Sequence, residues 1–174
     1  MVTAALRELL VRYKAIEFGE FTLASGAKST FYIDVKSAVT HPDLLGAIGS
    51  EVAGTYDFDV IAGVAVGGVP LAVAVSLVSK KPFAIIRSSE KGHGKKDLII
   101  GDVRGKNVLL IEDVTTSGGS ALYSIEILRA AGARADRVVT VVDREQGAGQ
   151  MLAEHGAKVI PLVRVSELLK SRDF

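Results

Sequence analysis

The sequence predicts an α/β fold, a doubly wound parallel sheet with helices on both faces. Short apolar segments that suit buried parallel strands alternate with helical patterns along most of the chain. Right-handed strand–helix–strand crossovers produce such alternation. The 174 residues are enough for one domain with a substantial core. We therefore expect a single domain, in which residues 1 to about 40 form a helix and a small cap and about 41–174 form the core.

The N-terminal part of the chain predicts this cap and the first core helix. Residues 6–13 carry apolar side chains at helical spacing, which is typical of an amphipathic helix. Residues 18–35 have the texture of short strands and turns, with one strand at 31–34. Pro42 then stands near the start of a helix whose apolar face falls within 44–52.

The remainder of the chain predicts the sheet and its crossover helices. Buried strands are expected at 60–66, 83–86, 108–111, 138–142 and 159–162. Helices are expected at 69–79 and around 122–128, the second closed by Gly132.

Composition excludes several classes of protein. With 21 basic and 20 acidic residues the net charge is +1, which gives no reason to expect a nucleic acid or a membrane as partner. The absence of cysteine excludes disulfides and thiolate metal sites. No apolar run approaches the length of a membrane span, and the start lacks the features of a signal peptide. We expect a cytoplasmic protein.

The most informative stretch is residues 108–120. A buried strand is expected to end in Glu112 and Asp113, followed by a turn of small residues that opens a helix. Free backbone N–H groups at a helix start bind phosphate. Two carboxylates beside that phosphate would repel it unless they bind ribose hydroxyls or Mg²⁺. The pattern therefore predicts a phosphorylated sugar as ligand.

This stretch resembles the phosphoribosyl pyrophosphate (PRPP) motif of the type I phosphoribosyltransferases. The resemblance implies that Glu112 and Asp113 hold the ribose hydroxyls, and that Asp113 also steadies positive charge developing on the sugar. It implies a 5′-phosphate site made by the following loop: Val114, Thr115, Thr116, Ser117, Gly118, Gly119 and Ser120. A solvated strand end followed by an ordinary helix cap is the alternative.

A second strand-to-helix junction, residues 64–70, contains Gly67 and Gly68. It resembles the family's pyrophosphate loop. Many orotate-specific members carry a Tyr-Lys pair at the places of Val66 and Gly67, so here the loop would bind by its backbone alone. A tight turn in which glycine is needed for positive φ is the alternative.

Residues 87–97 resemble the mobile catalytic loop of the orotate-specific members. The resemblance implies that Arg87, Lys91 and His93 bind the pyrophosphate of PRPP, with Lys91 and His93 stabilising it as it leaves. The family usually has a second lysine where this chain has Ser88, and the pair at 95–96 is a candidate substitute. Composition alone fits a solvated surface loop equally well.

Two further segments indicate which base the protein uses as substrate. Arg144 lies in an Asp-Arg turn which, in orotate-specific members, places the arginine on the carboxylate of orotate, and a guanidinium suits a carboxylate. The alternative is a surface pair with Glu145. Thr116 is expected to join Arg144 at orotate.

Residues 21–34 resemble the family's hood, which covers the base. Neighbouring residues of a strand face opposite sides, so only one of Phe31 and Tyr32 can stack on it, and we expect Phe31. Many members have a lysine where this chain has Ala24, and Lys28 is the candidate substitute. A hairpin with core aromatics is the alternative.

The resemblance covers nearly the whole chain and implies the type I phosphoribosyltransferase fold with a small N-terminal hood. It implies transfer of the phosphoribosyl group of PRPP to orotate, giving orotidine 5′-monophosphate and pyrophosphate in pyrimidine biosynthesis. Mg²⁺ would be held mainly through PRPP, with no direct protein ligand. A homodimer is expected, with the mobile loop shared between subunits. A purine phosphoribosyltransferase is the nearest alternative, and a non-catalytic PRPP sensor a more distant one.

Overall fold

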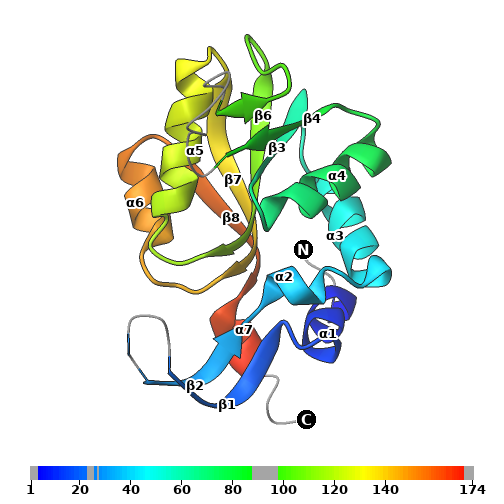
Figure 1. Cartoon of the computed structure of the whole chain (residues 1–174), viewed down its shortest axis with the longest axis vertical. Helices are drawn as coiled ribbons and strands as arrows, with labels where there is room; N and C mark the ends of the chain where they lie inside the picture. The colour runs from blue at the N-terminus through cyan, green and yellow to red at the C-terminus, as the bar shows by residue number, and fades with distance from the viewer. Residues whose placement is uncertain (1–3, 23–25, 27, 88–97, 171–174) are drawn as a thin grey trace, which may run out of the picture.

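The computed structural model describes residues 4–22, 26, 28–87 and 98–170. Within this part of the chain, six strands form a sheet in the order β5-β4-β3-β6-β7-β8 (Figure 1). Its strands are β3 (Val60–Val64), β4 (Phe83–Ile86), β5 (Ile99–Ile100), β6 (Asn107–Thr115), β7 (Arg134–Asp143) and β8 (Lys158–Arg164). The helices are α1 (Ala4–Arg12), α2 (Val35–Ala38), α3 (Pro42–Thr55), α4 (Gly68–Ser79), α5 (Gly119–Ala130), α6 (Ala148–Glu154) and α7 (Val165–Lys170).

The sheet is covered on both faces, which confirms the predicted fold class. One buried cluster joins the sheet to α3 and α4, and a second joins it to α5 and α6. Neighbouring strands run parallel except β5, which pairs antiparallel with β4 at the edge. A strand of two residues is too short to show in a hydropathy pattern. None of the described helices is long and apolar enough to cross a membrane.

Strand β6 includes the acidic pair, as expected, and continues two residues beyond it. The strand was predicted to end in Glu112 and Asp113, and its ladder with β7 runs on to Thr115, which pairs with Asp143. On its other side β6 loses its partner, because β3 ends at Val64. The acidic pair therefore lies inside the strand, in the part that projects past β3.

The order of the strands creates a crevice between β3 and β6. The chain leaves β3 into α4 on one face and leaves β6 into α5 on the other face. Open α/β sheets bind ligands at such a switch point, outside the carboxyl ends of the strands. Both glycine-containing junctions singled out in the sequence meet there.

A hairpin lies beyond this edge of the sheet (Figure 1). Its strands, β1 (Ile16–Thr22) and β2 (Lys28–Ile33), pair antiparallel, with Phe18 opposite Phe31. Helix α1, α2 and the C-terminal α7 pack into the same core cluster as α3, and an ion pair of 4.0 Å joins Arg7 of α1 to Glu167 of α7. The hairpin, α1 and α2 correspond to the N-terminal hood predicted from the sequence, and α7 packs with them without having been predicted there; the domain division at about residue 40 stays a prediction.

Candidate functional site

The two carboxylates of β6 are buried at the switch point. Glu112 is 5% exposed and Asp113 is 8% exposed, and as neighbours in a strand they face opposite sides of the sheet. Glu112 faces α5, where the hydroxyl of Ser120 donates a hydrogen bond of 3.0 Å to its Oε1. Burial raises the pKa of Glu112 to about 7, and the Ser120 hydrogen bond acts in the opposite direction. Glu112 therefore titrates close to neutral pH.

Asp113 lies on the other side, against the loop that follows β3. A Cβ built on Gly67 would lie 2.4 Å from the carboxyl carbon of Asp113. Gly67 has a φ of −63°, so its missing side chain matters here for the close approach of Asp113 and not for a positive φ. On its open side the Asp113 carboxylate lies 3.8 Å from the Nζ of Lys36. The carboxylate is thus held between a backbone and a cation.

The start of α4 sits directly on the sheet. A Cβ on Gly68 would meet the carbonyl oxygen of Ile111 at 2.6 Å, and one on Gly63 would meet that of Gly68 at 2.3 Å. The peptide bond between Ala65 and Val66, in the turn just before α4, is cis. These contacts bring the backbone of the first junction to the edge of the acidic pair.

The second junction, between β6 and α5, forms a small cradle. Gly118 adopts a φ of 90° and is the N-cap of α5, the left-handed conformation that glycine adopts without strain. Among the described residues, no hydrogen bond is recorded from the N–H groups of Ser117, Gly118 or Gly119. A cavity of about 100 Å³ lies here, lined by Glu112, Val114, Thr115, Thr116, Ser117, Gly118, Gly119, Ser120 and Ala121. Unpartnered N–H groups around a cavity suit an anion.

Among the residues predicted to bind the base of the substrate, Arg144 has a buried polar atom that lacks a hydrogen-bond partner in the described part of the chain. Its backbone N–H donates to the carbonyl of Thr115 at 2.9 Å, which ties it to the end of β6. Its Nε is buried and has no hydrogen-bond partner among the described residues. Glu145 accepts a hydrogen bond from the backbone N–H of Ser166, and no ion pair with Arg144 is recorded. The alternative of a surface Arg–Glu pair therefore does not describe this turn.

The hood supplies one aromatic ring to Arg144. The guanidinium carbon of Arg144 lies 5.9 Å from the centre of the Phe31 ring. Tyr32 is 45% exposed and meets the ring of Phe21 instead, at 5.7 Å. The structure thus brings Phe31 close to Arg144, and the stacking of Phe31 on a base stays a prediction.

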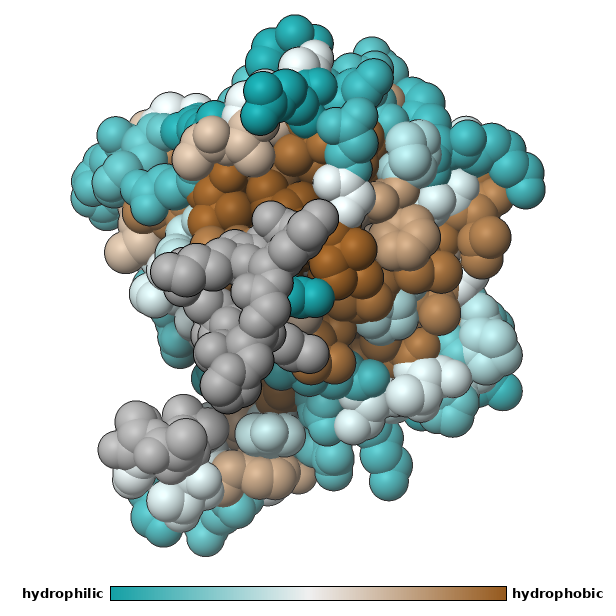
Figure 2. Space-filling model, turned by 45° about the horizontal axis from the view of Figure 1, so that its top comes forward, coloured by the Kyte–Doolittle hydropathy of each residue, from teal (hydrophilic) through white to brown (hydrophobic). Residues whose placement is uncertain are grey.

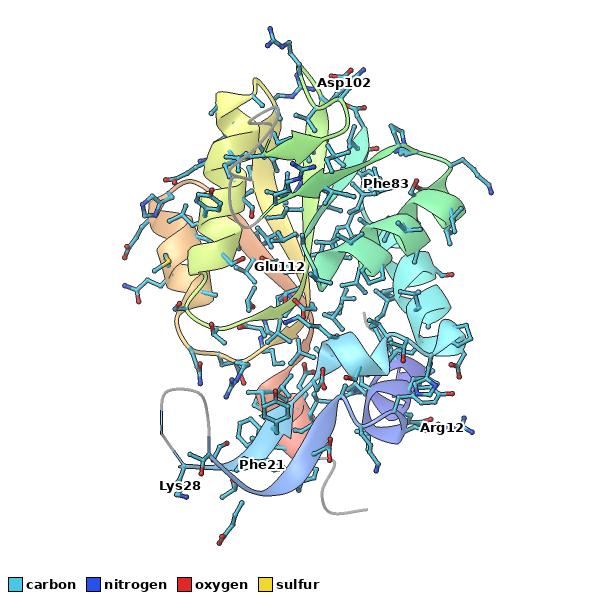
Figure 3. All side chains as sticks on the ribbon, in the orientation of Figure 1. Arg12, Phe21, Lys28, Phe83, Asp102 and Glu112 are labelled. Atoms are coloured by element: carbon cyan, nitrogen blue, oxygen red, sulfur yellow. The ribbon has the colours of Figure 1, made fainter. Side chains whose placement is uncertain are left out.

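Lys28 is not brought to the acidic pair. Its Nζ donates to the hydroxyl of Thr22 across the hairpin, at 3.0 Å. Figure 3 shows Lys28 at the outer end of the hairpin and Glu112 well apart from it, in the crevice. Residue 24 lies outside the described residues, so the substitution of Lys28 for a lysine at that place stays a prediction.

Of the three residues expected to bind pyrophosphate, the structure describes Arg87. Arg87 follows β4, and its backbone N–H donates to Leu98 at 2.9 Å. Lys91 and His93 lie outside the described residues. Lys36 was not predicted, since no sequence pattern relates a lysine in the hood to a carboxylate 77 positions further on, the separation of residues 36 and 113.

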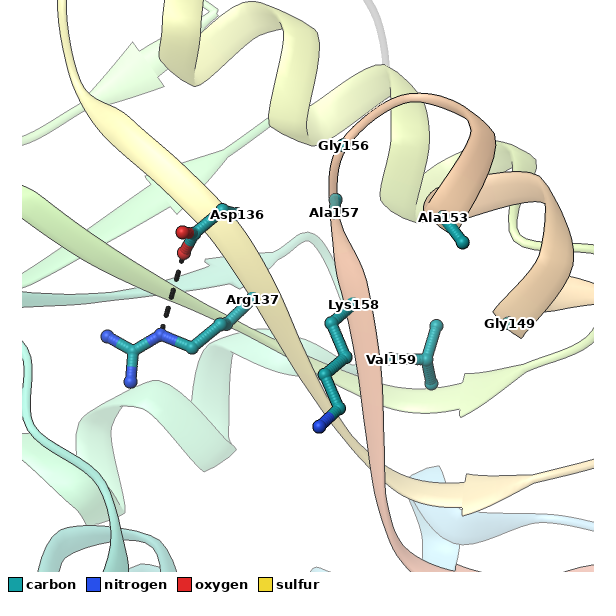
Figure 4. Close-up of a pocket in the computed structure, with 8 residues that line it drawn as sticks. All are labelled: Asp136, Arg137, Gly149, Ala153, Gly156, Ala157, Lys158 and Val159. Atoms are coloured by element: carbon teal, nitrogen blue, oxygen red, sulfur yellow. Dashed lines mark ion pairs between the residues drawn. The ribbon is translucent and has the colours of Figure 1, made fainter.

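A larger cavity lies elsewhere, at the amino ends of β7 and β8 (Figure 4). Its volume is about 560 Å³, and it is lined by Asp136, Arg137, Gly149, Ala153, Gly156, Ala157, Lys158 and Val159. Asp136 and Arg137 pair with each other there at 3.5 Å. None of the predicted site residues lines it, so chemistry, and not size, selects the switch-point site.

This chain is similar to known proteins in both sequence and structure. Residues 43–164 match the phosphoribosyl transferase domain family. The orotate phosphoribosyltransferase of Methanocorpusculum labreanum is 64% identical over 162 residues, 93% of this chain and 96% of that protein. The crystal structure of orotate phosphoribosyltransferase from Aeropyrum pernix superposes with a TM-score of 0.83 at 32% identity, covering 95% of this chain and 97% of that one.

A third relative was solved with a ligand. The orotate phosphoribosyltransferase of Mycobacterium tuberculosis in complex with PRPP has a TM-score of 0.78 at 29% identity, covering 95% of this chain and 97% of that one. The sequence match to the Methanocorpusculum labreanum protein covers 93% of this chain. The chain therefore belongs to the phosphoribosyltransferase family, in its orotate phosphoribosyltransferase branch.

Proposed function

We propose that the crevice between β3 and β6 binds PRPP and orotate together and transfers the phosphoribosyl group to orotate. The products are orotidine 5′-monophosphate and pyrophosphate, so the enzyme serves pyrimidine biosynthesis. A relative with a TM-score of 0.78 is known in complex with PRPP, which supports PRPP as the donor. The cytoplasmic location expected from composition stays a prediction.

The second junction is proposed to hold the phosphate end of the donor. Backbone N–H groups of Ser117, Gly118 and Gly119 would donate to the 5′-phosphate, and the adjoining hydroxyls would complete its shell. Glu112 and Asp113 would accept hydrogen bonds from the ribose hydroxyls. Because the sugar becomes oxocarbenium-like as pyrophosphate leaves, a carboxylate fixed beside it stabilises the transition state more than the ground state.

Orotate is proposed to bind between the hood and Arg144, with Thr116 beside it. Its carboxylate would accept hydrogen bonds from Arg144, and its ring would lie near Phe31. The deprotonated ring nitrogen of orotate then attacks C1′ while pyrophosphate departs from the opposite face. Catalysis would depend on orientation and on charge neutralisation.

One observation carries this assignment to orotate. Arg144 has a buried Nε with no partner in the described part of the chain. A buried donor without an acceptor costs free energy, about 1–3 kcal/mol for a typical group. A base with a carboxylate satisfies it, whereas a purine base brings no carboxylate.

The departing pyrophosphate is highly negative, and we propose that three side chains and one metal ion neutralise its charge. Arg87, Lys91 and His93 would neutralise the pyrophosphate, with His93 a candidate proton donor. No cluster of three metal-ligating side chains is found among the described residues. Mg²⁺ is therefore proposed to be held mainly through PRPP, where it would neutralise phosphate charge, with the carboxylates of Glu112 and Asp113 nearby.

A homodimer is proposed, with the segment that contains Lys91 and His93 reaching into the neighbouring site. The supporting observation is an apolar surface formed by Leu77, Val78, Phe83 and Ile100, which are 65%, 48%, 40% and 46% exposed. Figure 2 shows hydrophobic residues gathered on the side where Figure 1 places α4 and β4. Exposed apolar patches of this kind mark interaction sites.

The experiment that tests the function follows orotate by its ultraviolet absorbance, with PRPP and Mg²⁺ present. We expect orotate loss with release of pyrophosphate, unaffected by adenine, hypoxanthine or uracil as competitors. Turnover of a purine without turnover of orotate would overturn the substrate assignment. Tight PRPP binding without turnover of any base would point to a PRPP sensor.

A further inference from the structure

Lys36 lies on a short, well-anchored helix between the hood and the core. It belongs to α2, a four-residue helix that directly follows β2. The carboxylate of Asp34 caps this helix, accepting from the backbone N–H of Ser37 at 3.0 Å and from its hydroxyl at 2.7 Å. Val35 and Ala38 are buried on either side of Lys36. The helix is fixed, while the lysine side chain is 65% exposed.

The ammonium group of Lys36 faces the acidic pair. Its Nζ lies 3.8 Å from Oδ2 of Asp113, whose side chain is 12% exposed. Of the ion pairs recorded among the described residues, it alone reaches the switch point. Lys36 also acts on the neighbouring carboxyl, where its charge opposes the upward shift of the Glu112 pKa that burial causes.

We propose that Lys36 is a positioning residue for phosphoribosyl transfer, acting through Asp113. Its ammonium group holds the Asp113 carboxylate in its orientation toward the ribose site. It also brings to this edge of the sheet the positive charge that residue 67, as glycine, cannot carry. The inference rests on the proposed role of Asp113 in binding ribose.

The geometry explains why a cation is needed at this point. Asp113 and Glu112 are adjacent carboxylates in one buried segment, and the charge of Asp113 adds to burial in raising the pKa of Glu112. Residues 65–68 are Ala-Val-Gly-Gly, and none of them carries a positively charged side chain. Lys36 is the group that offsets the charge of Asp113 without entering the space beside Gly67.

The test compares Lys36→Met, which keeps much of the side-chain length and removes the charge, with Lys36→Arg, which keeps the charge. Lys158→Met is the matched control, because Lys158 is an exposed lysine at the other cavity, at the amino end of β8 (Figure 4). Each protein is assayed for the KM of PRPP, the KM of orotate and the pH dependence of kcat/KM. PRPP binding is measured separately by calorimetry, and folding by the melting temperature.

Lys36→Met should raise the KM and Kd of PRPP roughly tenfold, the size expected for one lost charge interaction at a partly buried site. The KM of orotate should change by less than about twofold. The acidic limb of the pH profile should move to higher pH, because Glu112 loses the nearby positive charge that lowers its pKa. Lys36→Arg should restore both readouts, and Lys158→Met should match the wild type.

An unchanged PRPP affinity and an unmoved pH profile in Lys36→Met would overturn the inference, as would equal losses in Lys36→Met and Lys36→Arg. If the wild type turned over orotate with PRPP while Lys36→Met did so equally well, only the role of Lys36 would fail. If the wild type bound no PRPP, the proposed function would fail, and the role of Lys36 with it.

Discussion

The carboxyl group of Asp113 lies directly against the backbone of Gly67, so that a Cβ at residue 67 would come within 2.4 Å of the carboxyl carbon. This contact joins the two strand-to-helix junctions that the sequence presents separately. It makes the loop that follows β3 and the Asp113 carboxylate one structural unit. Any side chain at residue 67 must displace the carboxylate.

Gly67→Ala should therefore lower kcat/KM for PRPP by about 10–100-fold, because small displacements of a positioned group cost that much. The melting temperature should fall little, since the end of the Asp113 side chain can turn away. Gly68→Ala should act differently: its Cβ would meet the backbone oxygen of Ile111, which cannot move, so stability should fall by about 1–3 kcal/mol. Steady-state kinetics and thermal melts separate the two effects.

The control for both variants is Gly46→Ala, since a Cβ there meets nothing within 4 Å in helix α3. It should leave kinetics unchanged and raise stability slightly. A Gly67→Ala enzyme with wild-type affinity for PRPP would show that Asp113 does not need its place against the loop.

Asp113→Asn should reduce kcat by about 100-fold or more while the protein stays folded, because an amide keeps the shape and removes the charge that stabilises the developing cation. Asp136→Asn, on an exposed residue whose recorded ion pair is with Arg137, should leave kcat unchanged. Turnover of both variants and their circular dichroism spectra check this. Near-normal turnover in Asp113→Asn would remove the ribose-binding role.

Glu112 should link both stability and PRPP binding to pH. Its folded-state pKa is about 7, raised by burial from the ordinary value of 4.5, so the folded protein holds a proton that the unfolded chain releases. Stability from this group is full below about pH 4.5 and declines as pH rises to about 7, by roughly 3 kcal/mol. Urea unfolding from pH 5 to pH 8 should show the decline, and Glu112→Gln should remove most of it.

Ribose hydroxyls donate best to the ionised form of Glu112, so PRPP binding should release a proton. The affinity for PRPP should then weaken as pH falls below about 7, by up to about tenfold per pH unit. PRPP itself ionises identically in every assay, so the difference between wild type and Glu112→Gln isolates the protein group. Identical pH dependence in the two proteins would contradict this linkage.

Leu77→Glu should dissociate the proposed homodimer, because it puts a charge in place of the most exposed of the four apolar side chains proposed to form the interface. Activity should fall with dimer content, as each site would lose the segment contributed by its neighbour. Val11→Glu changes an apolar residue of α1 that is 38% exposed, and should leave the mass unchanged. Sedimentation equilibrium measures the mass, and a monomeric wild type would overturn the proposal.

Much of the fold is readable in the sequence because buried parallel strands leave continuous apolar runs. Residues 83–86 and the helix expected at 69–79 are found within one residue of their predicted bounds. The end of β6 was predicted at Glu112 and Asp113, and its continuation to Thr115 was missed because that part is held by its pairing with β7 and not marked by its own hydropathy. Helix α2 was missed because four residues give no helical period.

The site is readable to the extent that its chemistry lies in contiguous segments. Loop 115–120 and Arg144 follow from their own motifs, and the structure brings them together at the end of β6. Lys36 could not be predicted, since its contact with Asp113 depends on how the hood meets the core. A cis bond before Val66 has no sequence signal either, because such bonds are confined almost entirely to proline.

The most direct test of the account compares orotate with uracil, which is the same ring without the carboxylate, in wild type and in Arg144→Gln. The wild type should prefer orotate strongly in kcat/KM, and the ratio should fall by about 100-fold or more in the variant, because a guanidinium–carboxylate pair is lost. The KM of PRPP should change little. A ratio that stayed the same would show that Arg144 does not recognise the carboxylate, and the assignment of the base site would be wrong.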